Sequence, residues 1–315
     1  MIAREAGSIH LVGGGYVNSL WRRNLGLVFA AAHLSREFGV RAYGTGLGLM
    51  PQNLADIARV KRDLDAFAVV TVRDAESAEL LGIERGEDDV FLNPRRAVST
   101  PGEGHRQIVV LVQGDLVDHL STDQIHAVIE THISRALGRG LRGITFLEAY
   151  PQHDSRLWGE LQRRFPEAEY VPFDHLWRHG VEVHPDQEWL TSRFHFHLLG
   201  AVGGAKGTAL VIDEGYYATK HASLLSAGTG WSVLQMRADA PADALPAPQS
   251  NPTFASDVER YHRSKIAQAE ALYPSRFALA RDAALVRLKS IVRAVVGQRV
   301  VGWVRRASSA RSVAS

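Results

Sequence analysis

Short apolar runs alternate with longer stretches of helical period in the first hundred residues. Each apolar run is rich in β-branched residues or ends at glycine, which is typical of buried strands. The alternation predicts strands at 8–12, 40–44 and 66–72 and helices at 21–38, 51–64 and 74–81. Strands that alternate with helices form a parallel sheet covered on both faces. We therefore expect a Rossmann-like domain here.

The same rhythm starts again after a break at 93–106 that contains proline, glycine and serine. It predicts strands at 108–112, 143–147, 169–171 and 208–212 and helices at 122–137 and 155–165. The fold class we expect is α/β, with two Rossmann-like domains that face a cleft. The predicted division is an N-terminal domain at 1–100, a C-terminal domain with the donor site at 105–239, a linker at 240–254 and a helical basic tail at 255–315.

Composition narrows the class of protein without naming an activity. The chain has 315 residues, 45% of them hydrophobic and 22% charged, which is enough apolar material for two globular domains. It has no cysteine, so disulfides and cysteine-bound metals are excluded. A formal net charge of +2 does not favour nucleic acid as a partner. We expect a cytoplasmic protein without a membrane-spanning helix, because no apolar stretch approaches about 20 residues.

Two glycine-rich turns follow neighbouring strands. Gly13-Gly14-Gly15 comes after the first strand, and Gly44-Thr45-Gly46-Leu47-Gly48 comes after the second. Glycines let backbone N–H groups approach an anion near a helix start. Gly13-Gly14-Gly15 lacks the spacing of a dinucleotide-binding fingerprint. Each alone fits a tight turn without a ligand, but two turns at neighbouring strand ends favour a shared crevice.

Cationic side chains stand at two further places where an anion can bind. Arg73 follows a predicted strand, and its guanidinium suits a carboxylate or phosphate, although a surface ion pair with Asp74 or Glu76 is the alternative. Arg193 and His195 precede an apolar stretch that we expect to be helical, so charge, imidazole and helix dipole can meet around one anion. His195 and His197 are a metal-binding alternative if the segment is a strand; histidines satisfied by backbone carbonyls are another, which fits His197 better.

Taken in order, these segments resemble the polysaccharide pyruvyl transferase family. The matching motifs are Gly13-Gly14-Gly15, Gly44-Thr45-Gly46-Leu47-Gly48, Val72-Arg73-Asp74-Ala75-Glu76-Ser77, Ser192-Arg193-Phe194-His195 and Tyr217-Ala218-Thr219-Lys220. The resemblance spans residues 8 to 230 and implies a glycosyltransferase-B-like pair of domains with the active site between them. It further implies transfer of the pyruvyl group of phosphoenolpyruvate onto two sugar hydroxyls, which gives a pyruvate ketal and phosphate. Phosphoenolpyruvate is the donor substrate, and no cofactor or metal is implied.

The resemblance also assigns site residues by motif. It implies that Arg73, Arg193 and His195 are the catalytic contacts to phosphoenolpyruvate. Donor-binding positions are expected at Gly14, Gly15, Gly46, Phe194 and Lys220. Two arginines suit a donor that carries both a carboxylate and a phosphate. We assign His195 as the acid that protonates the methylene carbon, or as a hydrogen-bond donor to the leaving phosphate.

This chain departs from the family pattern at its start. Members have a further strand and helix before the first glycine turn, so we expect a first domain shortened at its start, with an open sheet edge.

Two functions other than pyruvyl transfer remain open. A nucleotide-sugar glycosyltransferase of the same fold requires an acid for the ribose, and no clear candidate stands in the second domain. A non-catalytic binding relative is favoured by the short start and opposed by the presence of both arginines and the histidine.

The segment 281–315 is strongly basic. Seven arginines and lysines follow Arg281, against Asp282 alone, and apolar residues recur at helical spacing. A basic amphipathic helix suits peripheral contact with the inner face of an anionic membrane, which fits a glycan or glycolipid acceptor. A helix packed on the body with a solvated basic face is the alternative.

Overall fold

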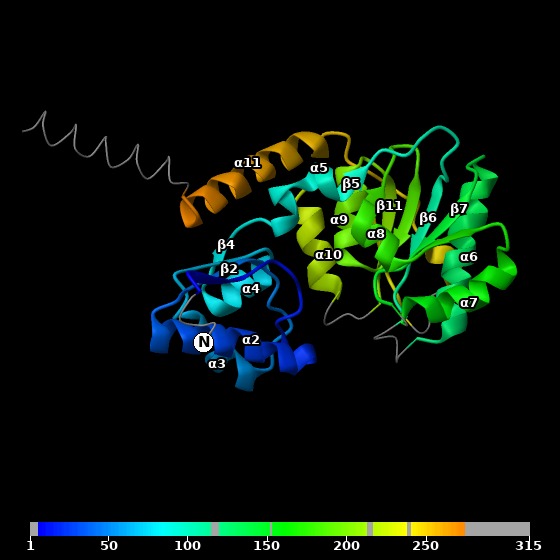
Figure 1. Ribbon diagram of the computed structural model, residues 1–315. Coiled ribbons are helices and arrows are strands. Elements are labelled where there is room, and N and C mark those ends of the chain that lie inside the picture. Colours follow the sequence, from blue (N-terminus) through cyan, green and yellow to red (C-terminus); the bar gives the residue numbers. More distant parts are fainter. Residues whose placement is uncertain (1–5, 115–119, 152, 213–216, 238–240, 275–315) are drawn as a thin grey trace, which may run out of the picture. The chain divides into compact units, whose positions relative to one another are not determined.

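The computed structural model describes residues 6–114, 120–151, 153–212, 217–237 and 241–274. Two parallel sheets organise the chain up to Lys265, each with its own hydrophobic core (Figure 1). The α/β class and the two Rossmann-like layers that the sequence predicts are confirmed. Helix α11 (Phe254–Leu272) follows the second sheet.

The first sheet has four parallel strands in the order β1-β2-β3-β4. Its strands are β1 (Ser8–Leu11), β2 (Arg41–Leu47), β3 (Val69–Val72) and β4 (Glu84–Arg85), and its helices are η1 (Ser19–Trp21), α2 (Arg22–Phe38), α3 (Leu54–Leu64) and α4 (Ala75–Leu81). All three predicted strands and all three predicted helices of this region are present. Strand β1 lies at one edge of the sheet, paired with β2.

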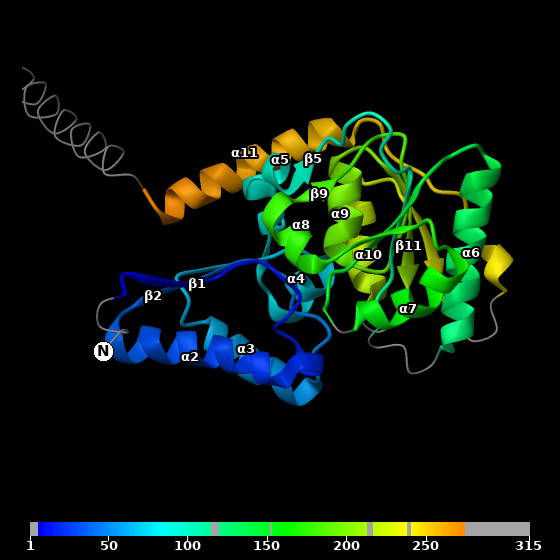
Figure 2. The ribbon, with the colours of Figure 1, turned by 45° about the vertical axis from the view of Figure 1, so that its right-hand side comes forward.

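Helices α2 and α3 lie on one face of the first sheet (Figure 2). Val28 and Ala32 of α2 and Val60 of α3 are buried in the same core as the strand residues. Local signals in the sequence set the helix ends. Gly39 ends α2 with a φ of 66°, a conformation that glycine adopts without steric cost, and the Asp74 side chain accepts from the Ser77 N–H at the start of α4.

The second glycine segment is part of a strand rather than a turn after one. Strand β2 runs through Leu47, and its pairing with β3 shifts register between Gly44 and Leu47. Gly46 takes a φ of 58° at this irregularity. Glycine adopts this left-handed conformation without steric cost, which explains glycine at the register shift without a ligand.

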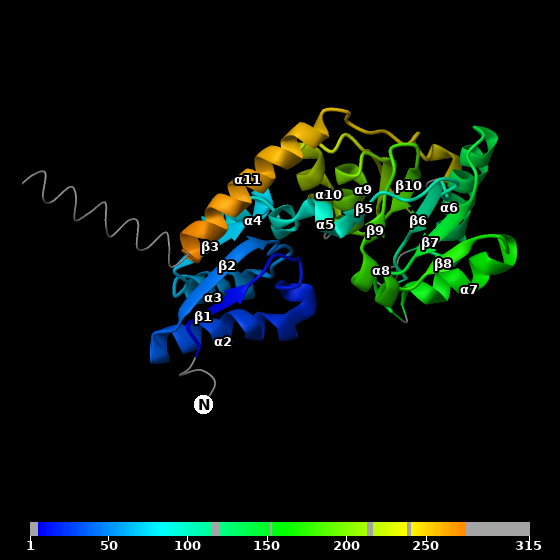
Figure 3. The ribbon, with the colours of Figure 1, turned by 45° about the horizontal axis from the view of Figure 1, so that its top comes forward.

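The second sheet has six parallel strands in the order β12-β11-β10-β6-β7-β8, several of which are seen side by side in Figure 3. Its strands are β6 (Ile108–Leu111), β7 (Ile144–Leu147), β8 (Glu169–Val171), β10 (Glu188–Thr191), β11 (Lys206–Val211) and β12 (Ser232–Gln235). Its helices are α6 (Thr122–Gly138), α7 (Asp154–Arg164), α8 (Phe173–His179), α9 (Phe194–Val202) and α10 (Tyr217–Ser226).

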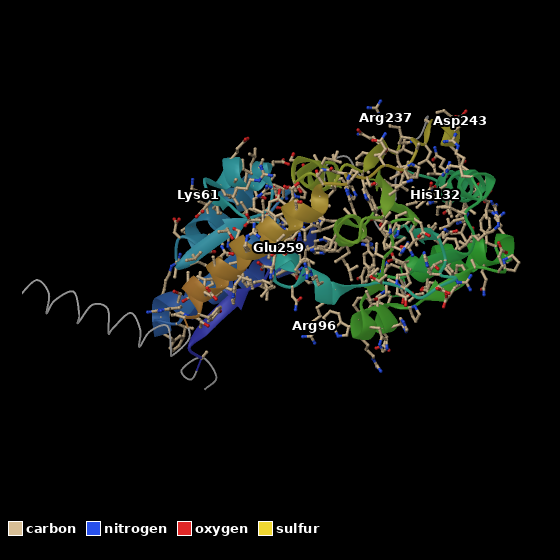
Figure 4. All side chains as sticks on the ribbon, turned by 90° about the horizontal axis from the view of Figure 1, so that it is seen from above. Lys61, Arg96, His132, Arg237, Asp243 and Glu259 are labelled. Atoms are coloured by element: carbon tan, nitrogen blue, oxygen red, sulfur yellow. The ribbon has the colours of Figure 1, made fainter. Side chains whose placement is uncertain are left out.

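Alternate residues of the second sheet enter cores on opposite faces. Ile108 and Val110 pack with α6 and α7, whereas Val109 and Leu111 pack with α8, α9 and α10. Side chains fill the space between this sheet and its helices (Figure 4), including His132 of α6, which is buried. The period of two along each strand therefore sets which helices cover which face.

Strands β10 and β12 and helix α8 were not predicted. Strand β10 is only four residues long and opens with a buried acid, Glu188, whose carboxylate pairs with Arg139. Strand β12 is half-buried along its length and lies at the sheet edge. Both therefore lack the apolar run that marks a central strand.

The segment between the two sheets packs with the second sheet from about residue 91 onward, earlier than the predicted domain boundary at residue 100. It contains η2 (Asp89–Leu92), α5 (Pro94–Ala97) and β5 (Val98–Ser99), and β5 pairs with β9 (Val181–Glu182). Phe91 is buried in the core formed with α8, α9 and α10.

The predicted linker at 240–254 packs on the second sheet. It includes η3 (Ala242–Ala244), buried Leu245 and a bridge between Gln249 and Gly207.

The basic segment 281–315 lies outside the described residues. Within the described ranges, every helix is too short or too polar to cross a bilayer.

Candidate functional site

The first glycine turn lies directly against cationic side chains. A Cβ on Gly15 would lie 2.6 Å from Lys220 Nζ and 3.1 Å from Arg73 Nη2. A Cβ on Gly48 would lie 3.0 Å from Arg73 Nε, so glycine favours this close approach as well. The backbone therefore makes room for two cations, one from each sheet's layer.

Arg73 is fixed in place on three sides. It follows β3, its side chain is buried, and its guanidinium pairs with Asp88. The guanidinium carbon lies 3.8 Å from the centre of the Phe194 ring, a cation–π distance. Arg73 Nη1 is also 3.2 Å from His195 Nε2. An arginine with so many partners is preorganised, so little entropy is lost when it meets an anion.

Asp88 joins Arg73 to His195. Its Oδ2 lies 3.3 Å from His195 Nε2, and its Oδ1 accepts from the Val90 N–H at 2.9 Å. Burial alone would raise the pKa of this carboxyl, but electrostatic interaction with His195 and Arg73, and hydrogen bonds to His195 and the Val90 N–H, hold the pKa of Asp88 well below its usual range. Asp88 is therefore held as a buried anion between Arg73 and His195.

His195 combines this support with access to the cavity. It lies in the first turn of α9, and its side chain is 43% exposed, whereas Asp88 is only 5% exposed. An imidazole with a buried carboxylate behind it and an open side in front can take up and deliver a proton.

Arg193 is held by a second buried acid. Its Nη2 is 2.7 Å from Asp154 Oδ1, and Asp154 Oδ2 accepts from the backbone N–H groups of Ala149 and Tyr150 at 3.0 and 2.8 Å. Asp154 Oδ1 also accepts from the Gly114 N–H at 3.2 Å. One carboxylate thus fixes the loops after β6 and β7 and aims Arg193 from the start of α9.

These groups share one cavity of about 560 Å³. Of the predicted site residues, its lining includes Gly14, Gly15, Arg73, Arg193, Phe194, His195 and Lys220. Aromatic side chains complete the wall: Tyr16, Trp21, Tyr150, Phe173 and Phe196. This volume is within the range of small-molecule sites.

Gly46, predicted at the donor site, does not line this cavity. A Cβ on Gly46 would lie 2.9 Å from the Asp89 N and 3.0 Å from the Glu87 carbonyl oxygen. The positive φ of Gly46 at the register shift in β2 and its close packing on the 87–89 segment account for glycine at this position. The prediction for Gly46 is therefore corrected from ligand contact to backbone packing.

The positions of His195 and His197 rule out the alternative in which both bind one metal ion. Both lie on α9 rather than on a strand, so they do not share a face. His197 is buried, with Nδ1 3.1 Å from His221 Nδ1 and Nε2 2.9 Å from Thr229 Oγ1. Burial and the neighbouring His221 hold the pKa of His197 well below its ordinary value. His197 is thus a satisfied core residue.

Sequence reasoning missed Asp88 and Asp154. Asp88 follows the two-residue strand β4, too short to be seen as a strand end, and Asp154 is the first residue of α7. An acid at a helix start is ordinarily a cap, but Asp154 accepts from the N–H groups of Ala149 and Tyr150, which precede α7. The distinguishing signal is the pairing with an arginine far along the chain, which the sequence does not display.

Comparisons with known proteins add little to this geometry. No family model matches the sequence, and no curated protein matches it. A solved structure of Arabidopsis thaliana UGT89C1 complexed with UDP-L-rhamnose is similar, with 12% sequence identity and a TM-score of 0.37. The match covers 76% of this chain, which spans 63% of the length of that one. The assignment of the fold rests on the strand order of the two sheets and on their hydrophobic cores.

Proposed function

We propose that the cavity binds phosphoenolpyruvate and that the chain transfers its pyruvyl group onto two hydroxyls of a sugar in a glycan or glycolipid. The observation that carries the proposal is the convergence of Arg73, Arg193, Lys220 and His195 on the Gly13-Gly14-Gly15 turn. The donor has two anionic groups at its ends, and the cavity presents cations from two separate layers of the fold. The motif resemblance given above supports the same donor.

The reaction divides into steps that these residues can serve. A proton added to the methylene carbon of phosphoenolpyruvate leaves an oxocarbenium-like centre at the neighbouring carbon. One sugar hydroxyl attacks that centre and loses its proton. The C–O bond to phosphate then breaks, its electron pair stays on the phosphate oxygen, and an oxocarbenium-like centre forms again. The second hydroxyl attacks this centre and its proton passes to the phosphate, so the products are a ketal and inorganic phosphate. His195 supplies the first proton, and Asp88, whose Oδ2 lies 3.3 Å from His195 Nε2, orients the imidazole.

The arginines act on charge rather than on protons. Arg73 and Arg193 bind the carboxylate and phosphate, and a charge-assisted hydrogen bond of this kind contributes about 1.5–3 kcal/mol. Lys220 lies on the same wall as Arg73 and adds a point charge near Gly15. The aromatic side chains of the wall suit the apolar faces of a sugar ring, which supports a carbohydrate acceptor.

The donor is tested by thermal-shift and calorimetric titration of the full chain with phosphoenolpyruvate and, in parallel, with a panel of nucleotide sugars. We expect stabilisation by phosphoenolpyruvate, lowered roughly 10-fold or more in affinity by Arg73→Lys or Arg193→Lys. Arg178→Gln, on the exposed surface of α8, is the matched control and leaves affinity unchanged. Stabilisation by nucleotide sugars alone would assign a glycosyltransferase instead, and no shift with either ligand would favour a non-catalytic binding protein.

The role of His195 is tested separately by phosphate release from phosphoenolpyruvate in the presence of glycan acceptors. His195→Ala should bind the donor with similar affinity and turn over at least roughly 100-fold more slowly, because general acid catalysis is lost. His179→Gln, on exposed α8, is the control for loss of a histidine as such. Turnover near that of the native chain in His195→Ala would remove His195 from the mechanism.

A further inference from the structure

Three ligating side chains converge at a place that the donor cavity does not use. His105 Nε2 and His184 Nδ1 lie 2.7 Å and 2.5 Å from the same carboxylate oxygen, Oδ1 of Asp186. All three ligating atoms lie within 4.8 Å of one another. We propose that His105, His184 and Asp186 form a zinc-binding site.

Hydrogen bonds around the cluster direct one nitrogen of each imidazole at the same carboxylate oxygen. His105 Nδ1 is 3.2 Å from the Gly102 carbonyl oxygen, which leaves Nε2 to face Asp186 Oδ1. His184 Nδ1 faces the same oxygen. A ring N–H donates to the carboxylate in these contacts, and a cation bound between the three atoms would take the place of those protons.

The surroundings match those of a metal ligand set. A ligating histidine ordinarily donates its second ring N–H to a carbonyl or carboxylate, as His105 does to Gly102. A ligating carboxylate is ordinarily held by a further hydrogen bond, and Gln107 Nε2 donates to Asp186 Oδ2 at 3.0 Å. The set is thus oriented before a metal arrives.

Strand pairing brings the two ligand segments together. His105 lies just before β6 and Asp186 just before β10, and these strands pair in parallel with Ile108 opposite Glu188. The Glu188 N–H donates to the Gln107 carbonyl at 2.8 Å, and Gln187 Nε2 donates to the Arg106 carbonyl at 3.0 Å. The site therefore lies at the amino-terminal edge of the sheet, whereas Arg193 of the donor cavity follows the carboxyl end of β10.

Two imidazoles and one carboxylate favour zinc among common divalent ions. Zinc accepts nitrogen ligands at about 2.0–2.1 Å and carboxylate oxygen at about 2.0–2.2 Å, which places tetrahedral ligand atoms roughly 3.4 Å apart. The present separations reach that value by side-chain movements of less than about 1 Å. His105 also lines a cavity of about 400 Å³ together with Glu182, which leaves a route for the ion and space for water as a fourth ligand.

The site is tested by calorimetric titration of the untagged, chelator-treated full chain with Zn²⁺ alone. We expect one ion per chain and an affinity lowered at least roughly 100-fold in His105→Gln or Asp186→Asn. Gln107→Ala should lower it by roughly 10–100-fold, because that residue only orients the carboxylate. Mg²⁺ and Ca²⁺, which prefer oxygen ligands, should not compete. Each variant is compared by circular dichroism with the native chain, so that loss of folding is recognised.

A second pair of histidines provides the control. His175 and His179 lie one turn apart on exposed α8, with ring centres 4.6 Å apart, and can chelate a metal without the proposed site. His175→Gln combined with His179→Gln should leave the one-to-one stoichiometry intact. Loss of binding in that double variant, unchanged binding in His105→Gln, or a native dissociation constant weaker than ~0.1 mM would each overturn the proposal.

Zinc at this site should stabilise the fold, since it joins the segments that enter β6 and β10. A ligand present at 100 times its dissociation constant should raise the Tm of a chain of this size by about 5 °C. The same Zn²⁺ concentration should leave the Tm of His184→Gln unchanged. Because the donor cavity shares no residue with this site, phosphoenolpyruvate binding and zinc binding can fail independently of each other.

Discussion

A buried lysine on α11 supports the glycine turn of the donor cavity through one carboxylate. Lys265 is 1% exposed, and its ammonium pairs with Asp89 Oδ1. Asp89 Oδ2 in turn accepts from the Gly13 N–H and from Thr45 Oγ1, both at 2.7 Å. The ammonium therefore compensates a carboxylate whose other oxygen holds the end of β1.

Lys265→Met tests this connection, because methionine keeps much of the apolar stem and removes the charge. Asp89 is then left buried beside two donors but without a cation. Removal of one partner of a buried ion pair costs about 3–5 kcal/mol in the free energy of unfolding. Replacing both charges costs much less, so Lys265→Met combined with Asp89→Asn should recover most of the loss, since the amide oxygen still accepts from Gly13.

Urea unfolding followed by tryptophan fluorescence and circular dichroism measures these free energies. Lys61→Met, an exposed lysine on α3 (Figure 4), is the matched control and should change stability by less than about 0.5 kcal/mol. The single Lys265→Met variant should also bind phosphoenolpyruvate more weakly than the double variant. A cost below about 1 kcal/mol for Lys265→Met, or a double variant no more stable than the single one, would refute the connection.

Further predictions concern single residues. Burial lowers the pKa of His132 to about 4, so between about pH 6.5 and pH 4 the unfolded chain binds a proton that the folded chain does not. The free energy of unfolding should therefore fall by about 3 kcal/mol as the pH drops through that range. In urea unfolding at pH 7 and pH 4.5, His132→Gln should show a smaller fall than the native chain. Gly15→Ala should weaken phosphoenolpyruvate binding in calorimetry, because its Cβ meets Lys220, whereas Gly26→Ala, with open space on α2, should leave binding unchanged. Gly46→Ala should lower the free energy of unfolding by about 1 kcal/mol or more, since φ is positive there.

The sequence predicts an element well where the hydrophobic pattern is long and a residue such as glycine marks its end. Helix α2 shows apolar positions at helical spacing and stops at a glycine, so its range was found to within a residue. The same reasoning missed strand β10, because the strand begins with Glu188. This acid is tolerated in a buried strand because it pairs with Arg139, the residue just after α6. Tertiary pairing of this kind overrides local preference and is not visible in a single sequence.

The sequence predicted which cationic residues form the candidate site, but not all of the contacts around them. Motif resemblance named Arg73, Arg193 and His195, and the structure brings all three to one cavity. Gly46 was misplaced, because a glycine needed for a bulge and a glycine needed for a ligand look the same in sequence. Only the φ value and the atoms around a glycine separate these two requirements.

The buried acids change what the cationic cavity is expected to recognise. Arg73 pairs with Asp88 and Arg193 with Asp154, so each guanidinium charge is offset by a carboxylate within hydrogen-bond distance. A cavity of unpaired cations would attract any anion and lose affinity steeply with salt. Paired arginines attract anions less strongly at a distance but present N–H donors at fixed positions. Selectivity for a donor with a carboxylate and a phosphate at a set spacing therefore depends on Asp88 and Asp154 as much as on the arginines that they hold.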